Sequence, residues 1–135
     1  MGYTHYWEFH QVPSAEKFAE FIEGVKHLTA TAQEAGIDIG SEKYESNSLR
    51  FNGVGAGEHE DFFIPLPVGD ERYDYGFCKT ARKPYDTAVT ASLILAKKIF
   101  GEDIEIRSDG RWIDWEGGQL LFETVYDIQP ESVLG

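Results

Sequence analysis

The stretch from Pro84 to Gly101 constrains the fold more than any other part of the chain. Pro84 suits the first position of a helix, Asp86 places a negative charge in the first turn, and Gly101 ends the pattern. The apolar residues between them cover more than one face of a helix: Ala88, Val89, Ala91, Leu93, Ile94, Leu95, Ala96, Ile99 and Phe100. A helix half exposed to water does not tolerate such a surface. We therefore predict a buried helix at the centre of the fold.

Three cations, Lys79, Arg82 and Lys83, precede this helix. The whole chain carries 12 bases and 24 acids, a net charge of −12, so a basic segment stands out. Because the first N–H groups of a helix attract anions, this segment is predicted to bind a phosphate or carboxylate ligand. The alternative is that Arg82 pairs with Asp86 while the other two bases are solvated.

The length of 135 residues predicts one domain, residues 1–135, with a core that needs no metal or disulfide. The single cysteine, Cys78, cannot form an internal disulfide, and the opening MGYTHYWEF lacks the features of a signal peptide. We therefore expect a cytoplasmic protein. No window approaches the roughly 20 apolar residues of a membrane span, so no membrane association is expected.

The negative net charge argues against direct nucleic-acid binding, which needs a continuous basic face. It permits the opposite role, an acidic surface that imitates nucleic acid and blocks a protein partner. The acids are scattered along the sequence, however, and scattered charge is typical of ordinary solubility.

Residues 3–10 alternate as in a strand whose inner side is aromatic. The inward residues are Tyr3, His5, Trp7 and Phe9. A histidine among aromatic residues is either a hydrogen-bonded core group or a functional group whose surroundings tune its pKa. His5 is therefore a candidate ligand-binding residue.

A second helix is predicted from Ser14, a good N-cap, to Gly36. Its apolar residues recur at three- and four-residue steps: Phe18, Phe21, Ile22, Val25, Leu28, Ala32 and Ala35. Further strands are predicted near residues 37–44, 48–54, 62–66 and 75–79, with a polar loop at 68–75.

The last third of the chain predicts a hairpin followed by a short helix. Ile104 and Ile106 alternate with polar residues, SDGR suits a tight turn, and Trp112 would begin the return strand. Asp114 would cap the final helix, and the tail from residue 128 is expected to fray. We predict an α+β domain in which a mostly antiparallel sheet is covered by two main helices and a short C-terminal helix.

Catalytic candidates follow the glycine-rich loop at residues 53–57. His59 would act as the acid or base, with Glu60 or Asp109 as its orienting carboxylate. No second histidine motif completes a metal set, so neither a metal nor a cofactor is predicted. Cys78 lies beside bases, which would lower its pKa and make it reactive, although a buried structural thiol is the more common case.

Several of these strings together resemble a family of small uncharacterised proteins of bacterial and phage genomes. They are MGYTHYW, FNGVG, HEDFF and FCKTARKPYD, then FG and SDG. The resemblance spans most of the chain and implies that these stretches belong to one module, in a bacterial or phage-infected cell. It implies no activity.

Three functions remain open at this point. The first is capture, without turnover, of a small anionic ligand such as a nucleotide. The cations of residues 79–83 would hold its charge, and Tyr6, Tyr85 or Trp112 would cover an apolar moiety. The second is an enzyme acting on a phosphorylated or carboxylated substrate through His59. The third is an acidic inhibitor of a macromolecular partner. The sequence leaves open whether the chain forms a homo-oligomer.

Overall fold

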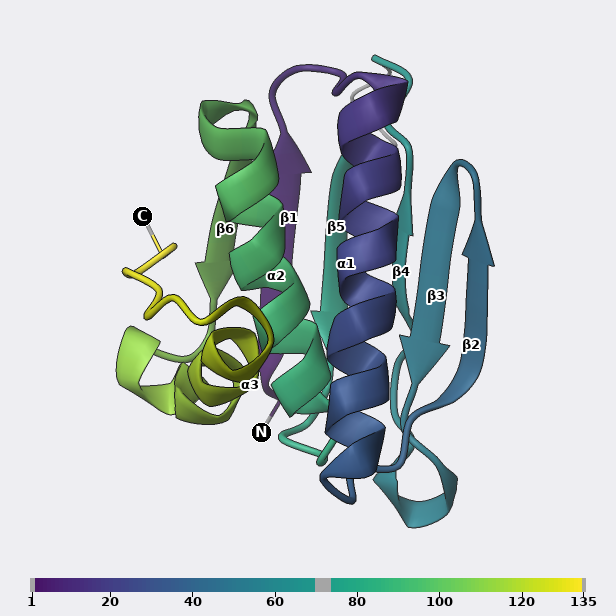
Figure 1. The fold of residues 1–135 in the computed structure, drawn as a ribbon, viewed down its shortest axis with the longest axis vertical. Coiled ribbons are helices and arrows are strands. Elements are labelled where there is room, and N and C mark those ends of the chain that lie inside the picture. Colours follow the sequence, from purple (N-terminus) through teal and green to yellow (C-terminus); the bar gives the residue numbers. More distant parts are fainter. Residues whose placement is uncertain (1, 70–73, 135) are drawn as a thin grey trace.

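A computed structural model describes residues 2–69 and 74–134, which form three helices and two three-stranded antiparallel sheets (Figure 1). The helices are α1 (Ala15–Glu34), α2 (Asp86–Phe100) and α3 (Glu116–Tyr126). The first sheet has the order β5-β1-β6, from Tyr75–Lys79, Thr4–Phe9 and Ile104–Ser108. The second has the order β2-β3-β4, from Gly40–Glu45, Ser48–Asn52 and Phe62–Pro65. The predicted α+β class is confirmed.

The six strands stand in one row, β6-β1-β5-β4-β3-β2, that is broken between β5 and β4 (Figure 1). We expected one sheet. Among the described residues, one backbone hydrogen bond joins the two sheets here, from Glu60 N just before β4 to Lys79 O at the end of β5, at 3.3 Å. Above that point the described parts of the two strands form no ladder.

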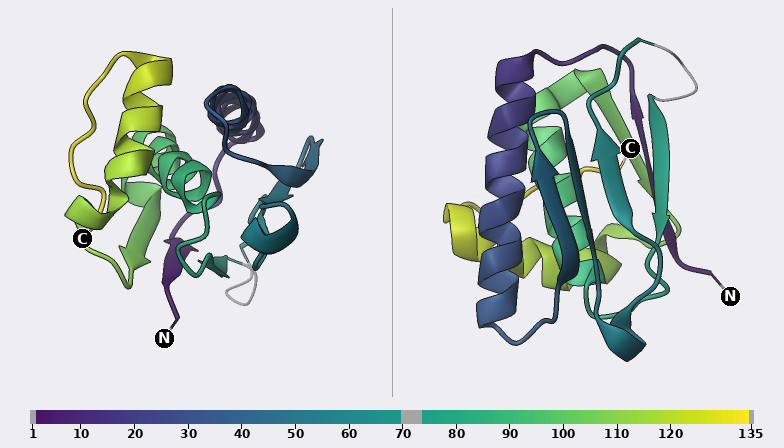
Figure 2. Two further views of the ribbon diagram at one scale, coloured as in Figure 1. Left: turned by 90° about the horizontal axis from the view of Figure 1, so that it is seen from below. Right: turned by 90° about the vertical axis from the view of Figure 1, so that its right-hand side faces the viewer.

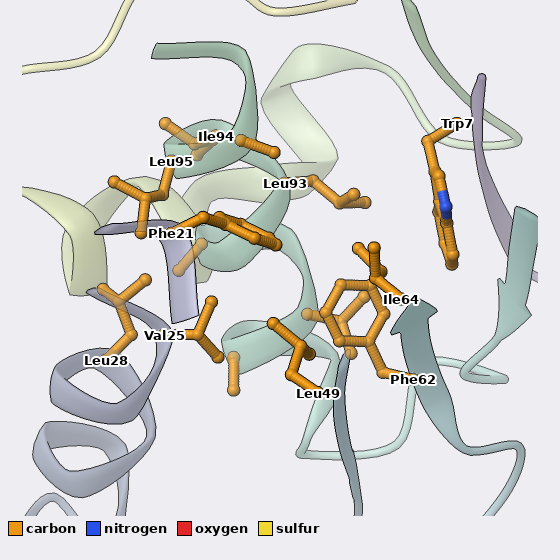
Figure 3. Packing of buried hydrophobic residues seen from close by; sticks show 14 of the residues in the cluster. Trp7, Phe21, Val25, Leu28, Leu49, Phe62, Ile64, Leu93, Ile94 and Leu95 are labelled. Carbon is orange, nitrogen blue, oxygen red and sulfur yellow. The ribbon is translucent and has the colours of Figure 1, made fainter. Parts of the chain in front are cut away.

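Helices α1 and α2 lie on one side of the strands, and α3 packs beside α2 (Figures 1 and 2). The core between them joins side chains of both helices to both sheets, as Figure 3 shows for Phe21, Leu93, Trp7 and Phe62. As predicted, α2 is buried on nearly every side, from Ala88 to Ala96 without a break.

The ends of the helices follow their sequence signals closely. The Ser14 hydroxyl caps α1 by accepting from Lys17 N at 3.1 Å. Regular helix α2 begins at Asp86 rather than at Pro84, because the first turn is tighter, with Asp86 N donating to Lys83 O at 2.9 Å. Gly101 ends the helix with a φ of 56°.

The C-terminal third departs from the prediction in two places. Trp112–Trp115 form a 3-10 turn instead of a return strand, because the Asp114 carboxylate accepts from Arg111 N at 2.7 Å and closes the chain on itself. The tail is not frayed at Leu134, which forms a parallel bridge with Ile106 beside the core. The predicted short C-terminal helix is present as α3, and its Leu121 and Phe122 are buried.

Two further findings bound the fold. In the predicted loop at 68–75, positions 70–73 lie outside the described residues. No described helix combines the length and the apolar character needed to cross a bilayer.

Candidate functional site

A cluster of polar side chains is enclosed where β1, the start of α2 and the end of β6 meet. His5 lies at its centre and is fully buried. Its Nε2 atom is 2.6 Å from Asp86 Oδ1, and its Nδ1 atom is 2.8 Å from Ser108 Oγ. The register of the first sheet brings these groups together, because β1 pairs His5 directly with Ser108 of β6. We call His5, Thr80, Asp86, Ser108 and Trp115 the His5 cluster.

The hydrogen bonds of the His5 cluster fit one arrangement of protons. The Asp86 carboxylate accepts from the Thr80 hydroxyl at 2.6 Å, and a neutral His5 donates to the same oxygen through Nε2–H. The Ser108 hydroxyl then donates to His5 Nδ1 and accepts from Gly110 N at 2.9 Å and from Trp115 Nε1 at 3.3 Å. In this assignment both ring nitrogens of His5, the Ser108 hydroxyl and the Trp115 indole N–H all have hydrogen-bond partners.

The chemistry open to this cluster is limited by that saturation. Asp86, His5 and Ser108 are the residue types of an acyl-transfer triad, with the two ring nitrogens exchanged. A nucleophilic serine needs a free lone pair, however, and both lone pairs of the Ser108 hydroxyl are engaged. His5 also has no exposed surface from which to protonate a leaving group. The cluster therefore acts as a structural link between five segments.

Tyr3 joins the cluster to the surface. Its ring stands edge-on to His5, with centroids 5.0 Å apart, and its hydroxyl is buried without a hydrogen-bond partner among the described residues. Burial raises the pKa of this hydroxyl and the Asp86 carboxylate raises it further, while the Arg82 guanidinium opposes both. The outer face of the ring is covered by Arg82, whose guanidinium carbon lies 4.0 Å from the ring centroid.

A hollow of about 440 Å³ opens beside this stacked pair, and Gly2, Tyr3, Ala81, Arg82 and Asp109 line it. Arg82 forms no ion pair with any carboxylate of the described residues. The pKa of Asp114 is lowered mainly by the hydrogen bond from Arg111 N. The positive charges of Arg111 and Arg82 lower it further. We call this space the Arg82 hollow.

The backbone that carries Arg82 is strained. Ala81 and Arg82 have φ values of 52° and 58°, in the left-handed region that side chains other than glycine avoid. Two hydrogen bonds hold the segment in place, because Thr80 N and Ala81 N both donate to Tyr3 O, at 3.1 and 3.3 Å. Such strain persists only where the surroundings enforce it, and it is common at binding sites.

Asp109 also lines the Arg82 hollow. Its Oδ2 accepts from Thr4 N at 3.0 Å and its Oδ1 accepts from Tyr6 OH at 3.3 Å. These bonds fix the carboxylate but leave lone pairs on both oxygens. The lining of the hollow thus includes a cationic group and a hydrogen-bond acceptor.

The other cations of the predicted site lie differently. The end of the Lys79 side chain rests against Gly2 at the rim, with Nζ 3.3 Å from the position that a Gly2 Cβ would take. Lys83 is half-buried and does not line the hollow. Neither lysine forms an ion pair with a described carboxylate. The alternative pair of Arg82 with Asp86 is also absent among the described residues, because the Asp86 carboxylate contacts His5.

The three aromatic candidates have separate places. Tyr85 is fully buried and donates to Glu60 O at 2.6 Å, so it belongs to the core and does not cover a ligand as we expected. Trp112 is half-buried against Trp115, with ring centroids 5.9 Å apart. Tyr6 is half-buried and reaches the Arg82 hollow only through Asp109.

The catalytic grouping around His59 is not assembled. The His59 side chain is exposed and forms no hydrogen bond with a described residue, while its backbone is held by Asn52. Glu60 accepts from Lys79 N at 2.7 Å, and Asp109 is committed to β1. Cys78 is buried, and burial raises the pKa of its thiol to about 12, so the reactive alternative is wrong.

Within residues 2–69 and 74–134, no group of three or more histidine, cysteine, aspartate or glutamate side chains has the arrangement of a metal site. Comparisons of the chain with protein-family models, with curated proteins and with solved structures found no match. The site must therefore be interpreted from its own geometry.

Proposed function

We propose that the protein captures a small anionic ligand in the Arg82 hollow and does not turn it over. The observation that carries this proposal is an arginine with no described carboxylate partner, stacked on Tyr3 at the edge of a hollow of about 440 Å³. A guanidinium held against a ring loses little freedom when it binds, and its planar fork matches carboxylate and phosphate oxygens. An arginine without a described carboxylate partner is unusual in a chain whose net charge is −12, because carboxylates outnumber cations two to one.

The two sides of the hollow narrow the class of ligand. Arg82 offers donors for a negative group, with Lys79 at the rim, whereas Asp109 offers acceptors. A ligand that carries only negative charge would be repelled by Asp109. A molecule with a phosphate or carboxylate at one end and hydroxyl or amino groups at the other satisfies both sides. Sugar phosphates and nucleotides, with their ribose hydroxyls, belong to this class.

Capture without turnover is favoured by the surroundings of the hollow. Among the described residues, its lining contains no cysteine, serine or histidine. The nearest such groups are in the His5 cluster, where the Ser108 hydroxyl is saturated and His5 is fully buried. These groups hold the walls of the hollow in position without reaching into it.

Calorimetric titration with ribose 5-phosphate, AMP and inorganic phosphate tests the proposal. We expect binding of at least one of the two phosphorylated sugars, and weaker binding of phosphate alone because phosphate lacks the sugar hydroxyls that Asp109 would accept from. Arg82→Ala should weaken binding about tenfold or more, as expected for loss of a charge-assisted contact. Asp109→Asn should weaken the sugar phosphates more than inorganic phosphate.

The matched control is Lys43→Ala, which removes an exposed cation of β2 that pairs with Glu45. Equal effects of Lys43→Ala and Arg82→Ala would reveal a general charge effect and refute the site. Hydrolysis of a phosphate or carboxylate ester that disappears in Ser108→Ala would refute the absence of turnover, and a circular-dichroism spectrum would confirm that the variant is folded.

A further inference from the structure

The Arg82 hollow lies beside the face of the first sheet that α1 and α2 leave uncovered. His5 and Cys78 are partners in the register of β1 and β5, and both are fully buried. Because side chains alternate along a strand, the next pair, Tyr6 and Phe77, points to the opposite, uncovered face (Figure 2). Asp109 reaches that face too, since its Oδ1 accepts from the Tyr6 hydroxyl at 3.3 Å. A path of neighbouring side chains therefore leads from the hollow through Asp109 to Tyr6 and Phe77.

Tyr6 and Phe77 form an aromatic surface at the end of this path. The Phe77 side chain is 55% exposed, although large apolar side chains are normally buried, and Tyr6 is half-buried. Directly opposite residues of antiparallel strands have Cβ atoms about 5 Å apart, so the two side chains are neighbours. Exposed aromatic side chains on a sheet are a surface on which nucleobases stack. The Tyr6–Phe77 pair can therefore bind a planar ring.

The spacing between the hollow and the Tyr6–Phe77 pair matches one class of ligand. Thr4 pairs with Lys79 and donates to Asp109, so this row of the sheet borders the hollow. Tyr6 and Phe77 pair two residues further along the same strands, which corresponds to about 7 Å. A pentose spans a comparable distance between a phosphate and a base. A ligand that fills both places thus carries a phosphate, sugar hydroxyls and a planar base in that order, as a nucleotide does.

The charges of the site indicate a single phosphate group. Arg82 lines the hollow and the Lys79 ammonium lies at its rim, so two cations are available to the ligand. A phosphate monoester carries a charge of about −1.5 to −2 at neutral pH, which two cations balance. Each further phosphate would add negative charge near the Asp109 carboxylate, in a chain whose net charge is already −12. A monophosphate is therefore the complementary ligand.

We infer that the ligand captured at Arg82 is a nucleoside 5′-monophosphate whose base stacks on Phe77 beside Tyr6. Arg82 and Lys79 hold the phosphate, Asp109 accepts from the ribose hydroxyls, and the aromatic pair binds the base. The inference rests on the ligand capture proposed above and adds a second binding surface outside the hollow. It is compatible with the acidic chain, because one nucleotide needs two local cations, whereas a nucleic-acid strand needs a continuous basic face.

Calorimetric titration of the full chain with AMP and ribose 5-phosphate isolates the contribution of the base. Both compounds carry the phosphate and the ribose that the Arg82 hollow would contact. We expect AMP to bind about tenfold more tightly, as expected for stacking of one base on an aromatic ring. Phe77→Ser should lower the affinity for AMP to that for ribose 5-phosphate, whose own affinity should not change. ATP should bind more weakly than AMP, because its additional charge has no cation to balance it.

Leu120→Ser is the matched control for Phe77→Ser. Leu120 is 58% exposed, about as much as Phe77, and lies on α3, away from this face of the sheet (Figure 1). This variant should bind both compounds normally. NMR of the unaltered chain gives a second readout that depends on no variant. AMP should shift the ring-proton resonances of Phe77, whereas ribose 5-phosphate should leave them in place.

The possible results separate this inference from the capture on which it rests. Equal affinities for AMP and ribose 5-phosphate would overturn the inference but not the capture, and so would Phe77 resonances that AMP does not shift. An equal loss of both compounds in Phe77→Ser would also overturn it, since the ring would then not act on the base. Tighter binding of ATP than of AMP would overturn the assignment of a monophosphate. If neither phosphorylated sugar bound at all, the capture at Arg82 would be refuted as well.

Discussion

His5 Nε2 and Asp86 Oδ1 lie 2.6 Å apart, although the two residues are 81 positions apart in the sequence. This contact connects β1 to the first turn of α2, and Thr80 donates to the same oxygen. It fixes the loop from residue 80 to residue 86, and therefore also the position of Arg82. The position of Arg82 thus depends on a hydrogen bond between two residues that do not line the Arg82 hollow.

The first prediction concerns this contact. Asp86→Asn keeps the shape of the side chain but removes the charge that both donors face. We expect a loss of about 2 kcal/mol in the free energy of unfolding, typical of hydrogen bonds to a charged group. Urea denaturation measures it. Asp38→Asn, at an exposed aspartate, provides the control and should change stability by less than about 0.5 kcal/mol. Equal stability of the two variants would show that the contact contributes nothing.

The second prediction concerns the strained backbone beside Arg82. Ala81→Gly should cost no stability, or should add up to about 1 kcal/mol, because glycine adopts a positive φ without strain. The same exchange at exposed Ala30 in α1 should cost about 1 kcal/mol. Thermal unfolding of both variants gives the comparison, and a similar loss in both would argue against the strain.

The third prediction concerns the packing of α3 on α2. A Cβ at Gly118 would overlap the Thr90 hydroxyl and lie 2.9 Å from Ala91 N, so Gly118→Ala should cost about 2 kcal/mol. Neighbouring Gly117 is exposed, and a Cβ there would meet only the side chain of Thr87. Gly117→Ala should therefore be neutral or stabilising, since alanine is the better helix former. The reverse order in chemical denaturation would contradict this packing.

The fourth prediction concerns pH. The pKa of the Cys78 thiol is raised by burial from 9.0 to about 12, so in that interval the unfolded chain releases a proton that the folded chain keeps. The contribution of this thiol to the free energy of unfolding is therefore fully present below pH 9 and is lost as the pH rises toward 12. Burial also raises the pKa of Tyr85 and Tyr44, which adds to the same slope.

Cys78→Ala should reduce the decline of unfolding free energy above pH 9 without abolishing it. The native thiol should also fail to react with a disulfide reagent at pH 8 and should react once urea unfolds the chain. Rapid labelling of the native protein would show that Cys78 is accessible.

Local patterns predicted most of the elements of the fold. The alternation of residues 3–10 correctly placed Tyr3, His5, Trp7 and Phe9 on the buried side of β1, and the apolar surface of α2 correctly predicted its burial. These features depend on periodicity, which neighbouring residues determine. The division into two sheets depends on how β4 and β5 diverge, and no local pattern reports that.

The site was predicted less completely for the same reason. A run of cations predicted Arg82 as a binding residue, whereas the sequence around Ser108 and Thr80 carries no distinctive signal. Their role comes from the register that pairs His5 with Ser108. A histidine predicted to face a core was the one available clue, because a buried imidazole requires polar partners. Here one of these partners, Ser108, stands at the end of the neighbouring strand β6. His59 was predicted as an acid or base from its position on a loop, and its side chain forms no hydrogen bond with a described residue.

Gly2 forms one wall of the Arg82 hollow, and this has a practical consequence for every binding measurement on the protein. An affinity tag fused ahead of Gly2 would begin at the mouth of the hollow, and an acidic tag there would compete with an anionic ligand for Arg82. Tags are better placed at the other end of the chain, where Leu134 lies beside β6.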